Sequence, residues 1–177
     1  VAVVLAYALR LRDNPLTRFA VRFASMGYAI PGSVIAVGIL IPLASFDNWL
    51  DAVLRQMLGV STGLLLTGTI AALVFAYLVR FLAVSFNTVE ASLAKIRPSM
   101  DWASRTLGQG PRGTLLRVHA PIMRSGLLTA ALLVFVDVMK ELPATLIVRP
   151  FNFDTLAVRV HRLAEDERLF DGTPELR

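Results

Sequence analysis

The stretch "GYAIPGSVIAVGILIPLASF" (residues 27–46) contains no charged side chain in twenty positions. A second stretch, residues 56–79, runs for 24 positions between Arg55 and Arg80 without a charge. A helix needs roughly 20 apolar residues to cross the hydrocarbon core of a bilayer. Both stretches reach this length. The sequence therefore predicts an integral membrane protein with membrane helices at 27–46 and 61–82.

The composition favours the same class. Of the 177 residues 55% are hydrophobic and only 18% are charged, whereas about 25% of residues are charged in a typical soluble domain. A third apolar run, 125–148, is also long enough to span, although it carries three charged residues. Residues 1–9 are apolar but too short, and we expect them to be the end of a membrane helix with further segments upstream. The fold class is thus predicted as all-α, a polytopic transmembrane bundle.

The distribution of charge predicts which loops lie inside the cell. Residues 10–24 hold four arginines against one aspartate, and residues 85–125 hold six basic against two acidic residues. Residues 47–61 and 149–177 have no such basic excess. Basic residues collect in cytoplasmic loops, so 10–24 and 85–124 are expected inside and 149–177 outside, as a periplasmic amphipathic segment. This pattern already explains the net charge of +5, and we expect no nucleic-acid partner.

The segment "TLGQGPRGTLLRVHAPIMRSG" (106–126) is basic and rich in glycine and proline. Pro98 is suited to the first turn of a short helix, and Gly108 to the left-handed residue just past its end. Pro111 is suited to the start of a second short helix, and Pro121 to its end or the start of the next. We therefore predict two short helices with a glycine corner on the inner face. A surface loop on the lipid headgroups is the alternative.

This segment resembles the EAA loop of permease subunits of binding-protein-dependent ABC importers. That pattern is Glu-Ala-Ala, three residues, Gly, nine residues, Ile, one residue, Leu, Pro, and its spacing is kept here. The Glu position is Trp102, and Asp101, one position earlier, is the nearest acid. The coupling residues implied by the resemblance are Asp101, Trp102, Ala103, Ser104, Gly108, Val118, Ala120 and Pro121.

Further stretches, above all "KELPATLIVRPFNFDTLA" (140–157), are similar to ferric-iron permeases. The resemblance implies one incomplete ABC transmembrane type-1 domain, in which 85–124 carries the coupling helices and one more membrane helix follows the chain. It implies an inner-membrane transporter subunit that imports ferric iron, or alternatively sulfate, molybdate, thiamine or a polyamine. The implied partners are a cytoplasmic ATP-binding subunit, an external binding protein, a second permease half and membrane lipid.

The resemblance implies no enzyme activity and no cofactor in this chain, with Mg-ATP on the partner subunit. The sequence itself contains no G-x-x-x-x-G-K-[ST] phosphate loop, no cysteine and only two histidines, so we expect neither catalytic nor metal-binding residues. An alternative from another class is a polytopic membrane enzyme or sensor whose active part lies elsewhere.

Asp137, Lys140 and Glu141 are ionisable residues in the run 125–148 and share one helix face. Charged residues inside a membrane usually face a bundle interior or a water-filled path. They are predicted either to line the translocation path or to form a self-neutralising pair. Residues 154–170 have the pattern of an amphipathic helix, with Gly172 as its stop.

Overall fold

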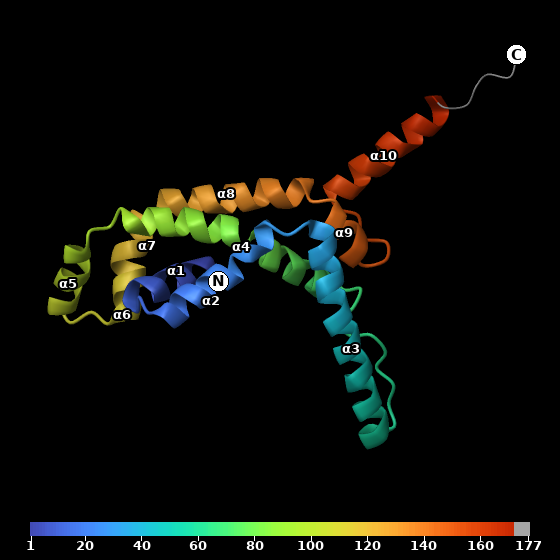
Figure 1. Ribbon diagram of the computed structural model, residues 1–177, viewed down its shortest axis with the longest axis horizontal. Coiled ribbons are helices and arrows are strands. Elements are labelled where there is room, and N and C mark those ends of the chain that lie inside the picture. Colours follow the sequence, from blue (N-terminus) through green and yellow to red (C-terminus); the bar gives the residue numbers. More distant parts are fainter. Residues whose placement is uncertain (172–177) are drawn as a thin grey trace, which may run out of the picture. The chain divides into compact units, whose positions relative to one another are not determined.

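The computed structural model describes residues 1–171, and their regular structure is entirely helical (Figure 1). The all-α prediction is confirmed. The expected stop at Gly172 lies outside the described residues. In chain order the helices are α1 Ala2–Leu11, α2 Pro15–Ala24, η1 Met26–Tyr28, α3 Gly32–Leu58, α4 Ile70–Ala94, α5 Pro98–Thr106, α6 Pro111–Thr114, η2 Leu115–His119, α7 Ala120–Ile122, α8 Arg124–Lys140, α9 Pro143–Val148 and α10 Leu156–Asp171.

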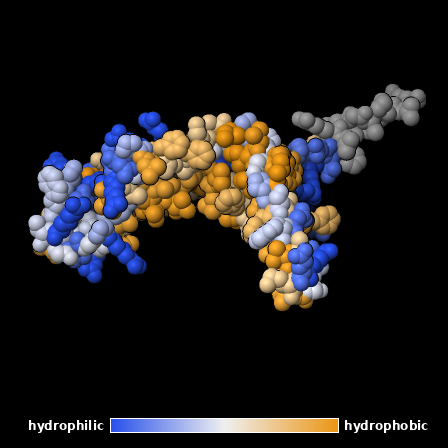
Figure 2. All heavy atoms as spheres, turned by 60° about the horizontal axis from the view of Figure 1, so that its bottom comes forward, coloured by the Kyte–Doolittle hydropathy of each residue, from blue (hydrophilic) through white to orange (hydrophobic). Residues whose placement is uncertain are grey.

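The chain forms two compact units. The first contains residues 1–29 and 79–136, and the second contains residues 30–78 and the part of the chain from Asp137 onward. Helices α3 and α4 are long and apolar enough to cross a membrane, with 27 and 25 residues. The stretch α6–α7 and helix α8 pass the same test only as a pair bent by 78°. Hydrophilic residues gather over α5–α7 and apolar residues over α4 and α8 (Figure 2).

The first unit has a core formed by side chains of α1, α2, α4 and α8 and of the turns beside them. Its buried residues are Ala6, Tyr7, Val21, Phe86, Val89, Leu93, Ile96, Met123 and Ala130. Two glycines allow close helix packing, because a Cβ on Gly27 would lie 2.2 Å from the carbonyl oxygen of Val79, and one on Gly126 would lie 1.8 Å from Ser92 Oγ. These contacts connect the chain before α3 and the start of α8 to α4.

In the second unit α3 packs on α9, and the connection after α3 folds back along it. Asp47 Oδ2 accepts a hydrogen bond of 2.7 Å from the backbone N–H of Thr67, and Asp51 Oδ1 accepts one of 2.8 Å from that of Thr62. Both carboxylates thus bind backbone N–H groups of the connection, which are not paired within a helix. The helix expected from residue 61 therefore begins only at Ile70.

The third apolar run also differs from its expected bounds. Helix α8 ends at Lys140 and Pro143 begins the six-residue helix α9. Proline has no N–H for an interior helical hydrogen bond, and it suits the first turn of a new helix. The segment 125–148 is thus two helices in place of one. In the expected outer tail, α10 leaves Leu156, Val160 and Leu163 exposed.

Candidate functional site

The corner between α5 and α6 has the conformation that its residues predict. Gly108 has φ = +78° and follows the last residues of α5. The N–H of Gly108 donates to the carbonyl of Arg105 at 2.9 Å, and that of Gln109 donates to Ser104 at 3.0 Å. This pair of bonds is the Schellman arrangement, which satisfies the last carbonyls of a helix. Pro98 and Pro111 occupy the first turns of α5 and α6 as expected.

Beyond this corner the backbone is helical from Pro111 to Ile122 but contains a π turn at Leu115–His119. The N–H of Ala120 donates to the carbonyl of Leu115, five residues earlier. Pro121 follows directly and cannot donate an N–H. The π turn therefore lies next to the position where the missing N–H of Pro121 interrupts the regular hydrogen bonds of the helix. The helix continues past Pro121 to Ile122.

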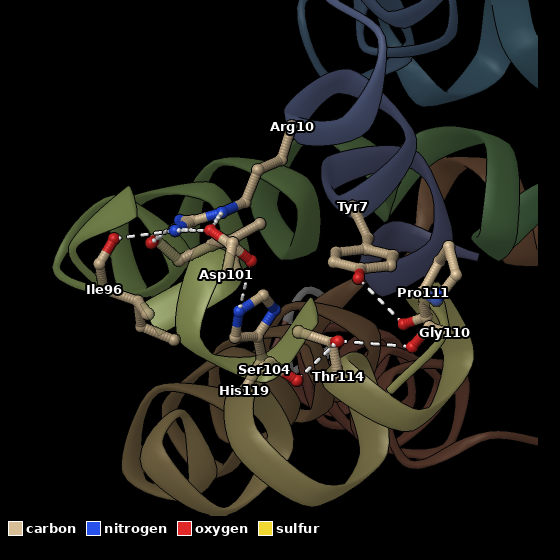
Figure 3. A network of polar contacts seen from close by, with 10 residues as sticks. Tyr7, Arg10, Ile96, Asp101, Ser104, Gly110, Pro111, Thr114 and His119 are labelled. Atoms are coloured by element: carbon tan, nitrogen blue, oxygen red, sulfur yellow. Dashed lines mark hydrogen bonds and ion pairs between the residues drawn. The ribbon is translucent and has the colours of Figure 1, made fainter. Parts of the chain in front are cut away.

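Asp101 lies between two basic groups inside the first unit (Figure 3). Its Oδ2 accepts hydrogen bonds from Arg10 Nη2 at 2.6 Å and Arg10 Nε at 3.0 Å. Its Oδ1 lies 2.9 Å from Nε2 of His119, a ring that is completely buried. The same guanidinium donates to the carbonyls of Leu93 at 2.6 Å and Ile96 at 2.8 Å. One arginine on α1 thus connects the end of α4 with α5.

The His119 ring is held in a low-dielectric environment. Burial lowers its pKa below the ordinary value, Arg10 lowers it further, and the contact with Asp101 raises it only in part. The lowered pKa favours the neutral form of the ring. The Nδ1 atom has no hydrogen-bond partner among the described residues, and the edge of the ring packs against Tyr7 with centroids 5.4 Å apart.

Two further contacts join α5 and α6 to each other and to α1 (Figure 3). The hydroxyls of Ser104 and Thr114 lie 2.8 Å apart and are both buried. The phenol of Tyr7 donates to the carbonyl of Pro111 at 2.8 Å. Buried hydroxyls without partners are costly, so these paired groups favour one geometry of the corner.

The structure divides the expected coupling residues into an inner and an outer set. Asp101 and Ser104 point into the network just described, while Val118 and Ala120 are half-buried. The exposed members are Trp102, Ala103, Gly108 and Pro121. Leu107 and Leu116, which the pattern does not include, are also exposed large apolar residues of this segment. The sequence interpretation missed Arg10, whose partners are 83 to 91 positions away.

The three charged residues near the end of α8 have separate environments in the second unit. Lys140 Nζ lies 2.8 Å from Asp137 Oδ1, with side chains that are 69% and 13% exposed. Glu141 is buried, and its Oε1 accepts a bond from the N–H of Ala144 at 3.2 Å, in the first turn of α9. The Thr145 hydroxyl donates to the carbonyl of Glu141 at 2.5 Å and lies 2.6 Å from the hydroxyl of Tyr77. Glu141 therefore stabilises the start of α9.

The ion pair permits a double-mutant test. Lys140→Met should reduce assembly or transport more than Asp137→Asn combined with Lys140→Met, because the single change leaves a largely buried carboxylate without its partner. The measurement is yield of folded protein and uptake for each single and the double variant. Damage in the double variant equal to the sum of the singles would contradict a compensating pair and favour direct roles in the path.

Curated relatives point to one class of protein. Over 167 residues the chain is 26% identical to the Fe(3+)-transport system permease protein FbpB 2 of Haemophilus influenzae. The matched stretch covers 94% of this chain and 30% of the relative. Over 107 residues it is 28% identical to a permease protein of Salmonella typhimurium named for 2-aminoethylphosphonate transport, covering 60% of this chain and 40% of the relative. A Salmonella typhi protein with the same name is 27% identical.

The chain spans only 30% to 40% of the length of these relatives. No family model matches it. The resemblance predicted from the sequence is nevertheless confirmed by the curated relatives, and α3 and α4 are long and apolar enough to cross a bilayer. The chain is therefore a helical membrane protein that is similar to permease proteins of bacterial transport systems.

Proposed function

We propose that this chain is part of the membrane-spanning subunit of an ATP-driven importer, with α5–α7 as the segment that contacts the ATP-binding subunit. The observation that carries the proposal is the exposed, internally fixed corner at Gly108. The Schellman bonds fix the turn after α5, the Ser104–Thr114 contact joins the two short helices, and Arg10 holds α5 to α1. A segment held in one geometry is able to pass a displacement of its partner to the membrane helices.

The outer surface of this segment is suited to a protein partner. Trp102, Leu107 and Leu116 are large apolar side chains left exposed beside the arginines of the same segment. Aromatic and arginine side chains dominate binding energy at protein interfaces. Asp101 is bound internally, so in the proposed complex the contact of α5 with the ATP-binding subunit depends on Trp102 in place of an acid.

In the proposed cycle ATP and Mg²⁺ bind to the partner subunit, and this chain contributes no residue to hydrolysis. The ATP-binding subunits move on nucleotide binding, the α5–α7 segment follows, and the membrane helices alternate between outward and inward openings. An external binding protein delivers the substrate, and a second permease half completes the path. Asp137, Lys140 and Glu141 are the candidate polar residues of that path.

Ferric iron is the substrate we favour, because the more extensive match is to a permease named for Fe(3+) transport. The second relative is named for 2-aminoethylphosphonate, so a phosphonate is the competing substrate. The complete permease should be purified with its ATP-binding subunit and its binding protein, and the ligand carried by the binding protein identified. Iron-stimulated ATP hydrolysis in reconstituted membranes supports the assignment, and stimulation by the phosphonate alone contradicts it.

The corner gives a direct test of coupling. Gly108→Val places a β-branched residue at φ = +78°, a strain of about 1–3 kcal/mol. A Cβ there would meet no atom within 4 Å, so the effect is one of backbone conformation and not of packing. We expect the variant to insert normally but to lose most of its association with the ATP-binding subunit or of the hydrolysis stimulated by the binding protein.

Gly110→Val is the matched control, because Gly110 has an ordinary φ of −74° and also has open space at its Cβ. Pull-down of the ATP-binding subunit and stimulated hydrolysis are measured for both variants. If Gly108→Val retains wild-type association, hydrolysis and uptake, the segment is a connecting loop and the proposed coupling role fails.

A further inference from the structure

Helix α2 presents an apolar face that the described residues leave uncovered. Leu16, Phe19 and Phe23 are 75%, 68% and 70% exposed, respectively. Their spacing places them on one side of the helix. The rings of Phe19 and Phe23 are stacked, with centroids 6.3 Å apart, so they form a continuous apolar surface. Contiguous exposed apolar surface on a protein usually marks a contact with another molecule or with lipid.

A different side of α2 is fixed to the protein. Val21 is buried in the core of the first unit. The helix begins at Pro15, and the side chain of Asn14 accepts a hydrogen bond of 2.7 Å from the N–H of Thr17. Helix α2 is thus a capped, anchored element whose exposed apolar side chains are held in place, and not a frayed connection.

Basic residues lie beside the apolar face. Residues 10–24 contain four arginines and a single aspartate. Arg12 and Arg22 are exposed, and Arg18 is paired with Asp13 on the surface. At 100° per residue Arg18 and Arg22 lie between the buried side at Val21 and the apolar side at Phe19. This is the arrangement of a helix that lies in a membrane interface, with arginines at the level of the lipid phosphates.

An open hollow of about 640 Å³ adjoins these arginines within the first unit, and its lining is both apolar and polar. The polar and charged side chains of this lining are Arg10, Asp13, Arg18, Arg22, Ser25, Asn87 and Glu90. The Ser25 hydroxyl is buried and has no hydrogen-bond partner among the described residues. Guanidinium groups bind phosphate through paired charge-assisted hydrogen bonds, and the hydroxyl and amide offer further bonds to a polar headgroup.

We propose that α2 is an interfacial helix that binds anionic phospholipid of the inner leaflet. Leu16, Phe19 and Phe23 enter the acyl-chain region, while Arg22 at the hollow and the exposed Arg12 before α2 bind headgroup phosphates. The charge of residues 10–24 selects this occupant, because an anionic lipid surface attracts basic segments next to membrane helices. The proposal requires only that the chain lies in a membrane and is independent of its substrate.

The absence of cysteine from residues 1–177 makes a site-specific probe possible. The complete permease carrying Phe23→Cys is labelled with a fluorophore and reconstituted into neutral phosphatidylcholine vesicles or into vesicles that also contain phosphatidylglycerol. Quenching is compared for brominated phosphatidylglycerol, brominated phosphatidylcholine at equal content, and aqueous iodide. Ser99→Cys, at an exposed position beside the start of α5, is the reference for a water-facing label.

The expected result is strong quenching of the Phe23 label by brominated lipid and weak quenching by iodide, with a preference for brominated phosphatidylglycerol. Replacing both Arg12 and Arg22 by Gln should lower that preference about fivefold for each arginine removed. Arg159→Gln, an exposed arginine of α10, should leave it unchanged. Quenching by iodide alone, or by neither agent because another protein segment covers the face, would overturn the proposal. Equal quenching by both brominated lipids would overturn the assignment to anionic lipid.

Discussion

Replacing Arg10 by Met is expected to detach α1 from α5 and to abolish coupling while leaving the long apolar helices able to insert. The guanidinium donates to Asp101 and to the carbonyls of Leu93 and Ile96, and it is only 18% exposed. Its removal leaves the mostly buried carboxylate of Asp101 without the guanidinium that pairs with it. Breaking such a pair from one side costs about 3–5 kcal/mol.

The measurement is thermal unfolding in detergent together with limited proteolysis between residues 97 and 123. Arg10→Met should lower the unfolding temperature and expose this segment to protease, whereas Arg12→Met, at an exposed position, should do neither. Adding Asp101→Asn to Arg10→Met should recover only part of the loss, because the stranded charge is removed while the bonds from the guanidinium to the carbonyls of Leu93 and Ile96 stay lost. If Arg10→Met has the same unfolding temperature and protease resistance as Arg12→Met, the position of Asp101 does not depend on its bonds to Arg10.

Gly27→Ala should be among the most damaging single-methyl changes in the first unit. The added Cβ would lie 2.2 Å from the carbonyl oxygen of Val79 and 3.4 Å from the Cα of Arg80. Both contacts are with the backbone of α4, so no side-chain rotation relieves them. Overpacking of a fixed contact costs about 1–3 kcal/mol and occasionally more, and we expect the upper end here.

Gly38→Ala provides the matched comparison, since a Cβ at Gly38 meets no described atom within 4 Å and alanine is the better helix former. Folded yield and unfolding temperature in detergent should fall for Gly27→Ala and stay level or rise for Gly38→Ala. Equal stability of the two variants would show that Gly27 can move away from α4 at little cost.

The parts of the fold that were predictable depend on signals confined to a few residues. Pro98 and Pro111 restrict their own φ, Gly108 tolerates a positive φ, and the corner these residues predicted is present. The long uncharged runs predicted α3 and α4 for a similar reason, because an apolar helix satisfies its own backbone groups.

The remaining features depend on partners that are distant in sequence. The run 61–69 carries no charge, but the backbone N–H groups of Thr62 and Thr67 donate to Asp51 and Asp47 of the preceding helix, 11 and 20 positions earlier. Asp101 was predicted as a coupling residue, but Arg10 lies 91 positions earlier and holds it inside. A single sequence contains no signal for such a pair. Ser104 is likewise buried because Thr114 faces it across the glycine corner.

The π turn at Leu115–His119 determines how a change in the number of residues between Gly108 and Pro121 would affect the fold. A π turn contains about one residue more than an α turn, so this short stretch stores one residue of extra length. Each residue of an α-helix rotates the chain by about 100°. Deleting one residue between Gly113 and Pro121 could be absorbed by a regular α turn, while inserting one would rotate His119 away from Asp101. This segment should therefore tolerate the deletion of one residue better than the insertion of one.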